Sequence, residues 1–160
     1  MKINNKNIKI KDILEKDVPI GEKDLNLKDA IKLMINKHTN IFIALNEKKE
    51  IQGLFTLYDI LDKILPFFLK VDSIISYISV NEIISKEKIK QLSCLKVRDI
   101  MIKKVYSLKE EDDFIKAISL MYVKNFDYIP IVNKKNKYVG VVNRLKVEKT
   151  IVELIENNFK

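Results

Sequence analysis

The chain contains one cysteine, Cys94, and one histidine, His38. A single cysteine cannot form a disulfide within the chain, which suits a reducing compartment. One histidine and one cysteine cannot supply the four ligands of an ordinary zinc site. The sequence therefore predicts neither a disulfide framework nor a metal centre.

Glycine is also scarce, with three residues in the whole chain. So few glycines leave little material for a phosphate-cradling loop, and the sequence contains no P-loop, G-x-G-x-x-G, H-E-x-x-H or G-x-S-x-G pattern. The many carboxylates lie among lysines on faces that the pattern assigns to solvent. We therefore expect no enzymatic activity and no catalytic residue.

Long apolar runs are missing. No stretch approaches the roughly 20 apolar residues that a membrane-spanning helix needs. The N-terminus, MKINNKNIKIKDILEKD, lacks the apolar core of a signal peptide. The sequence predicts a soluble, cytoplasmic protein with no membrane partner.

The charge is unbalanced, with a formal net charge of +8 that comes mostly from scattered lysines. This balance favours anionic partners but identifies none. Only two arginines are present, Arg98 and Arg144, and no basic run carries interleaved aromatic residues. A solvated, lysine-rich surface is favoured over a nucleic-acid face.

What the sequence does contain is a repeat. Residues 9–61 align with residues 96–148 at a constant offset of 87, without a gap, and thirteen of the 53 pairs are identical. KIKDIL aligns with KVRDIM, AIKLMINK with AISLMYVK, and GLFTLYDIL with GVVNRLKVE. Such a register indicates two copies of one structural unit.

Each copy predicts the same succession of elements. A short helical turn (12–14; 99–101) leads to a brief strand around Val18 or Val105. An amphipathic helix, two apolar strands joined by a charged turn, and a closing helix follow. The predicted buried stripes are Leu27, Ala30, Ile31, Met34 and Ile35 in the first copy, and Phe114, Ala117, Ile118 and Met121 in the second. The expected fold is α/β (α+β), with two β-α-β-β-α units packed about a pseudo-twofold axis.

Between the copies lies an apolar segment in which Pro66 should end a helix. We expect it to be a helical connector, either a lid over the two units or a surface for self-association. The expected divisions are thus residues 1–61, residues 62–95 as connector, and residues 96–160, which include a C-terminal helix.

The repeat resembles a known family. DIL or DIM, an amphipathic helix containing A-h-x-h-M (h apolar), the strand YIPIVN and a strand ending G-h-h resemble the CBS motif. Two such motifs in tandem, over residues 9–61 and 96–148, resemble a CBS pair, or Bateman module. The resemblance implies a regulatory module without catalysis, which binds adenine nucleotides or related adenosine compounds between the motifs and signals to a partner.

Thr56 and Asp59 lie where the last strand of the first copy gives way to its closing helix. The spacing predicts a capping box, in which the Thr56 hydroxyl accepts a backbone N–H and the Asp59 carboxylate reaches back to another. A helix start also suits a phosphate, and carboxylate oxygens accept from the vicinal hydroxyls of a ribose. The resemblance implies that Asp59 binds ribose and that Thr56 faces phosphate.

The second copy departs from this pattern because Asn143 and Lys146 occupy the matching positions. Asparagine caps a helix well, but lysine cannot accept from ribose hydroxyls and opposes the helix dipole. The second site therefore looks degenerate. Lys146 and Arg144 either supply charge to the phosphates of a ligand held by the first copy or lie on the solvated surface.

The base pocket follows from the resemblance alone. Adenine would rest against the first strand, at Val18 and Ile20, and against the second strand, at Ile41, Phe42 and Ile43. These side chains also fit a plain apolar core.

Two functions remain open. The first is a sensor of an adenosine compound (AMP, ADP, ATP or S-adenosylmethionine), with no cofactor required and an unidentified regulated protein as partner. The second is a structural or protein-interaction module without nucleotide binding. In both cases we expect a homodimer.

Overall fold

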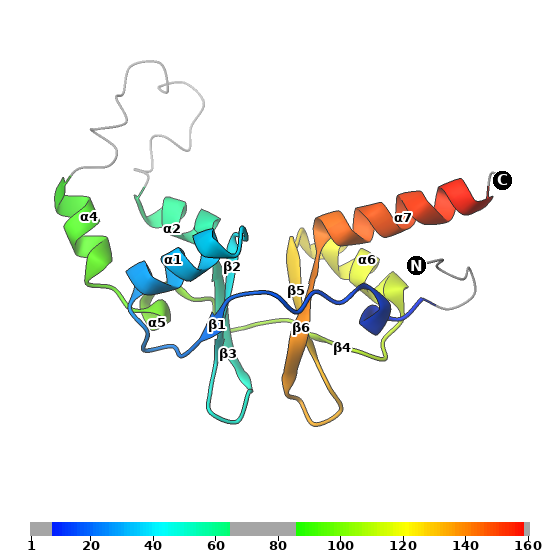
Figure 1. The fold of residues 1–160 in the computed structure, drawn as a ribbon, viewed down its shortest axis with the longest axis horizontal. Coiled ribbons are helices and arrows are strands. Elements are labelled where there is room, and N and C mark those ends of the chain that lie inside the picture. Colours follow the sequence, from blue (N-terminus) through cyan, green and yellow to red (C-terminus); the bar gives the residue numbers. More distant parts are fainter. Residues whose placement is uncertain (1–7, 65–85, 159–160) are drawn as a thin grey trace, which may run out of the picture. The chain divides into compact units, whose positions relative to one another are not determined.

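The computed structural model describes residues 8–64 and 86–158 (Figure 1). Their mixed α+β fold, as predicted, has two three-stranded sheets, ordered β1-β2-β3 and β4-β5-β6. These residues divide into two compact units. The first-repeat unit comprises residues 19–46, 51–64 and 86–104, and the second-repeat unit comprises residues 8–18, 47–50 and 105–158.

The first-repeat unit follows the predicted order of elements. Strand β1 pairs parallel with β2, and β2 pairs antiparallel with β3. The elements are β1 (Ile20–Gly21), α1 (Leu27–Asn36), β2 (Ile41–Leu45), β3 (Ile51–Thr56), α2 (Leu57–Ile64), α4 (Lys86–Ser93) and α5 (Val97–Ile100).

The second-repeat unit repeats this topology, with β4 parallel to β5 and β5 antiparallel to β6. Its elements are the 3-10 helix η1 (Ile10–Ile13), β4 (Leu108–Lys109), α6 (Phe114–Lys124), β5 (Tyr128–Val132), β6 (Tyr138–Asn143) and α7 (Arg144–Asn158). The first strands, expected around Val18 and Val105, begin instead at Ile20 and Leu108.

Apolar faces of the helices build the two cores. In α1, Leu27, Ala30 and Met34 are fully buried, as predicted, but Ile35 is 60% exposed. Ile35 lies about 100° further around the helix than Met34, so it leaves the buried stripe. In α6, Phe114, Ala117 and Met121 are buried at the same spacing.

The short helices η1 and α5 are exchanged between the repeats. Ile10 and Ile13 of η1 lie in the core of the second-repeat unit. Val97 and Ile100 of α5 lie in the core of the first-repeat unit. Each short helix therefore packs in the unit that contains the sheet of the other repeat. Neither unit corresponds to one continuous repeat of the sequence.

Backbone hydrogen bonds hold η1 to the turn before α6. The N–H of Ile10 donates to the Asp112 carbonyl at 3.0 Å, and the N–H of Phe114 donates to the Ile8 carbonyl at 3.0 Å. In the first-repeat unit, the N–H of Val97 donates to the Leu25 carbonyl in the equivalent way, also at 3.0 Å. These hydrogen bonds attach each short helix to the unit in which it packs.

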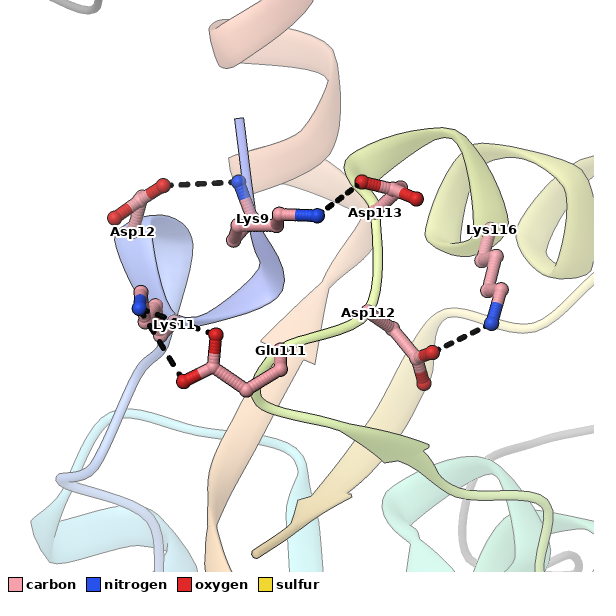
Figure 2. A network of polar contacts seen from close by, with 7 residues as sticks. All are labelled: Lys9, Lys11, Asp12, Glu111, Asp112, Asp113 and Lys116. Carbon is pink, nitrogen blue, oxygen red and sulfur yellow. Dashed lines mark hydrogen bonds and ion pairs between the residues drawn. The ribbon is translucent and has the colours of Figure 1, made fainter. Parts of the chain in front are cut away.

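Ion pairs line the same junction (Figure 2). Lys9 Nζ lies 2.6 Å from Asp113 Oδ1, and Lys11 Nζ lies 3.2 Å from Glu111 Oε2. The hydrogen bond to Asp113 raises the pKa of Lys9, and the hydrogen bond from Lys116 lowers the pKa of Asp112. Because the four side chains of the Lys9–Asp113 and Lys11–Glu111 pairs are 31–52% exposed, burial of Ile10 and Ile13 contributes more to docking than these ion pairs do.

The predicted connector is described only at its ends. Helix α4 forms its last part, and Pro66 with residues 74–84 lies outside the described residues. Cys94, just after α4, is exposed. Among the described residues no helix has the length and apolar character needed to cross a membrane.

Candidate functional site

The junction between β3 and α2 places Thr56 and Asp59 together. Thr56 ends β3, and the N–H of Leu57 donates to the Asn40 carbonyl at 3.0 Å, where α2 begins. Phe55 before the junction and Ile60 after it are both buried, which anchors the strand and the helix on either side. Thr56 and Asp59 themselves are half-buried.

Only one of the two hydrogen bonds of the predicted capping box forms. Asp59 Oδ2 accepts the backbone N–H of Thr56 at 2.7 Å, as expected. The Thr56 hydroxyl, however, donates to the same oxygen at 2.8 Å instead of accepting a backbone N–H. The hydroxyl gains more by donating to the carboxylate than by accepting a neutral backbone N–H, because hydrogen bonds to a charged group are roughly twice as strong as neutral ones.

The second oxygen of Asp59 is left open. Asp59 Oδ1 accepts no hydrogen bond from any residue that the structure describes. An ionised carboxylate oxygen has acceptor capacity for two donors. Asp59 therefore combines one oxygen committed to the helix cap with one that is available to a hydroxyl donor.

Gly53 allows a second backbone segment to lie against β3. Leu54 and Ile102 exchange two backbone hydrogen bonds, of 3.2 and 2.7 Å. A Cβ at Gly53 would lie 2.6 Å from Met101 Sδ and 2.9 Å from the Ile102 carbonyl oxygen. Only glycine permits this approach, which brings the half-exposed Ile102 next to the strand that ends at Thr56.

The matching junction of the second repeat is built differently. Asn143 Oδ1 accepts the N–H of Lys146 at 2.7 Å, which confirms Asn143 as the helix cap. Asn143 Nδ2 donates to Glu15 Oε2 at 2.5 Å. Glu15 comes from the N-terminal segment and pairs with Val141 of β6 through the backbone. A carboxylate thus lies at this helix start as well, but it comes from another part of the chain.

Sequence reasoning did not identify Glu15. It is 128 residues from Asn143 in the sequence, and its aligned partner in the second repeat is Ile102. No local spacing links the two residues, because the exchange of η1 brings Glu15 to this junction.

Near Glu15 lies Tyr138, whose hydroxyl is buried without a partner among the described residues. Burial, assisted by the negative charge of Glu15, raises the pKa of Tyr138 to about 12.

Arg144 has a structural position. Its Nε donates to Asp127 Oδ1 at 2.8 Å, and its Nη2 donates to Asn125 Oδ1 and to the Phe126 carbonyl, both at 3.0 Å. The guanidinium thus closes the C-terminal end of α6. Lys146 is exposed, and its ammonium has no ion-pair partner among the described residues. The predicted contact of these two cations with phosphate stays a prediction.

The residues of the predicted base pocket differ in exposure. Ile20, on the short edge strand β1, is 50% exposed. Val18, Ile41, Phe42 and Ile43 are buried, and the Phe42 ring stacks on Phe55 with centroids 5.4 Å apart. The N–H of Ile43 donates to the Pro19 carbonyl at 3.1 Å. Of this set, only Ile20 presents substantial side-chain surface.

Hydrogen bonding is the chemistry that the Thr56–Asp59 junction can offer. Within residues 8–64 and 86–158 no three histidine, cysteine or acidic side chains gather in a way that could hold a metal ion. The junction at Thr56 instead offers a carboxylate oxygen that no described residue occupies, and the same unit has exposed apolar side chains at Ile20, on β1, and at Ile102, beside β3. The carboxylate oxygen suits a hydroxyl donor, and exposed apolar side chains suit a ring system.

Comparison with curated proteins finds both whole-length and partial relatives. An uncharacterised protein of Methanocaldococcus jannaschii, MJ1426, is 27% identical over 90% of this chain and 91% of its own length. A homoserine O-acetyltransferase of Methanococcus vannielii is 38% identical over 40% of this chain, but the match spans only 13% of the enzyme. A second one, of Methanosalsum zhilinae, is matched over 24% of its length.

Solved structures share the fold. A CBS domain-containing protein of unknown function from Bacillus anthracis matches with a TM-score of 0.73 and 21% identity, over 91% of this chain and 94% of that one. The pair protein CBSX2 of Arabidopsis thaliana, in its complex with AMP, matches with a TM-score of 0.67 and 16% identity, over 91% and 97%. The CBS domain pair of protein MJ0100, in complex with 5′-methylthioadenosine and S-adenosyl-L-methionine, matches with a TM-score of 0.67 and 19% identity, over 91% and 96%.

The family model for the CBS domain matches residues 10–66 and again residues 97–153. These two segments coincide with the repeat and make up more than half of the chain. The same β-α-β-β-α order occurs in both units of the structure. The chain therefore belongs to the CBS domain family, with two CBS domains in tandem.

Proposed function

We propose that this protein is a regulatory, non-catalytic module that binds an adenosine-containing compound at its first CBS domain and passes that occupancy to a partner protein. The observation that carries the proposal is the Asp59 carboxylate, because one of its oxygens holds the start of α2 and the other has no partner within residues 8–64 and 86–158. A ribose diol supplies two hydroxyl donors to such an acceptor.

Two related pairs support the ligand class. CBSX2 has been crystallised with AMP, and the MJ0100 pair with 5′-methylthioadenosine and S-adenosyl-L-methionine. All three compounds contain adenosine and differ at the 5′ position, so the shared element is the nucleoside. Asp59 would accept from the ribose, Thr56 would face the 5′ substituent, and Ile20 would border the base. Ile41, Phe42 and Ile43, which are buried in the same unit as Ile20, would support the pocket through their packing, and contact of Val18 with the base stays a prediction from the sequence.

The experiment is a binding titration by calorimetry, with AMP, ATP, adenosine, 5′-methylthioadenosine and S-adenosyl-L-methionine. The wild type is compared with Asp59→Asn, which keeps a side chain able to cap α2 but removes the carboxylate. Asp62→Asn, one turn further along α2, is the charge-matched control. We expect saturable binding that Asp59→Asn abolishes and Asp62→Asn preserves. Absence of binding by every compound would rule out the proposal.

A second function is favoured by the same bonds. Because Thr56 and Asp59 satisfy one another as a helix cap, the motif has a structural role that requires no ligand. A module of this kind would act through dimerisation. It predicts that Asp59→Asn leaves every titration flat, as in the wild type, and that sedimentation shows a dimer. Cytoplasmic location and the existence of a regulated partner protein stay predictions from the sequence.

A further inference from the structure

The two helix starts differ in which polar atoms are already occupied. At the start of α7, both polar atoms of the Asn143 side chain are engaged. Its Oδ1 accepts from Lys146 and its Nδ2 donates to Glu15. At the start of α2, Asp59 Oδ1 has no partner among the described residues. Both helix starts are thus capped, but among the described residues only the first repeat leaves a side-chain oxygen of its cap without a partner.

Glu15 is held at this position by its backbone as well as by its side chain. Its N–H donates to the Val141 carbonyl at 2.9 Å, and the N–H of Val141 donates back to the Glu15 carbonyl at 2.8 Å. A Cβ at Gly140 would lie 2.6 Å from that same carbonyl oxygen, so only glycine allows the segment to lie so close to β6. The contact is therefore part of the fold and not an incidental meeting of two surface side chains.

Charge explains why a carboxylate is stable there. The first turn of α7 has Arg144 and Lys146 but no acidic residue, although the positive end of a helix dipole favours an anion. Asp127 pairs with Arg144. The first turn of α7 itself offers no anion to the positive helix end or to Lys146. Glu15 supplies that negative charge from the N-terminal segment. Its effect on the pKa of the nearby Tyr138 agrees with this placement.

We propose that Glu15 is an internal occupant of the second repeat, so that the chain takes up one adenosine compound, at the first repeat. A ligand phosphate approaching the start of α7 would meet the Glu15 carboxylate, which repels it. This deepens the proposed function and rests on it, since it decides how many ligands one chain can hold.

The experiment is a calorimetric titration of the full-length chain with AMP, read as the number of ligands bound per chain. The wild type is compared with Glu15→Ala, with Glu15→Gln and with the double variant Asp59→Asn/Glu15→Ala. Glu153→Gln, an exposed site on α7, is the charge-matched control. Glu15→Gln keeps a group near Asn143 while removing the charge, so it remains informative if Glu15→Ala does not fold. Circular dichroism establishes the native fold of each variant.

The expected result is one AMP per wild-type chain and two per Glu15→Ala or Glu15→Gln chain. The helix start and Lys146 then suit a phosphate, and in Glu15→Ala the Asn143 amide is released as a further donor. In the double variant, the second event alone should persist.

Binding of two AMP molecules per wild-type chain would overturn the inference. If Glu15→Gln then lost one of the two, Glu15 would itself be a hydrogen-bond acceptor for the ligand. One AMP in a folded Glu15 variant would also overturn it and would leave the proposed function intact. No binding by the wild type would overturn both.

Discussion

Asp59 Oδ2 accepts two hydrogen bonds from one residue, the N–H of Thr56 at 2.7 Å and its hydroxyl at 2.8 Å. The pair is therefore a helix cap whether or not a ligand is present. The helix cap depends on Oδ2, and the proposed ligand binding would depend on Oδ1, so substitutions can separate the two.

Asp59→Ala should lower the free energy of unfolding by about 1 kcal/mol, because the Thr56 N–H and hydroxyl lose their acceptor. Asp59→Asn should cost less, since an amide oxygen can still accept. Urea denaturation of both variants measures the difference. Equal losses for alanine and asparagine would show that the charge, and not the hydrogen bonding, stabilises the start of α2.

Ile13→Ala should destabilise the second-repeat unit, although Ile13 belongs to the first repeat in the sequence. Ile13 is 1% exposed and packs in the core of that unit, so its truncation should cost about 2–5 kcal/mol. Hydrogen exchange should show faster exchange in β5, β6 and α6 than in β2 and β3. Lys9→Ala, which removes a solvated ion pair at the same junction, should have a much smaller effect. Loss of protection confined to β2 and β3 would contradict the exchange of short helices.

Tyr138→Phe should be neutral or stabilising at pH 7, by up to about 1 kcal/mol, because the hydroxyl that it removes is buried and has no partner in the part of the chain that the structure describes. The pKa of Tyr138 is raised from 10.0 to about 12 in the folded protein. Between these values the unfolded chain releases the Tyr138 proton and the folded chain retains it, so wild-type stability should fall as the pH rises through this window. The variant should lose less stability there, as measured by urea denaturation at pH 7 and at pH 11. Tyr122→Phe, at an 87% exposed tyrosine, is the control and should follow the wild type.

Arg144→Ala should destabilise the protein by about 1–3 kcal/mol. It removes the bond to Asp127 and leaves the carbonyl of Phe126 at the end of α6 without its donor. Arg144→Lys should restore little, because an ammonium cannot reproduce the planar fork of donors. Thermal unfolding of the two variants measures the effect. If Arg144→Ala instead left stability unchanged and weakened only AMP binding, the guanidinium would be a ligand contact, which is one of the two alternatives that the sequence left open.

The sequence by itself determined the repeat, the order of elements in each copy and the helix start at Thr56. Each of these depends on residues close together in the chain. The buried stripe of α1 depends on spacings of three and four residues, and the cap depends on an acidic residue three positions after Thr56. The boundaries of the first strands did not follow from the local pattern, because β1 and β4 are only two residues long and pairing with β2 and β5 sets their position.

Only the tertiary structure decided which unit each short helix joins and what lies at the start of α7. Two similar repeats present two similar surfaces, and no local pattern says whether Ile10 and Ile13 pack against their own sheet or the other one. That choice depends on the summed burial and backbone pairing of segments about a hundred residues apart. Once η1 docks in the second-repeat unit, Glu15 comes to lie beside Asn143. The sequence shows Asp59 in one repeat and Lys146 at the matching position of the other. In the structure, Asp59 keeps one oxygen without a partner among the described residues, whereas Glu15 of the same chain occupies the start of α7.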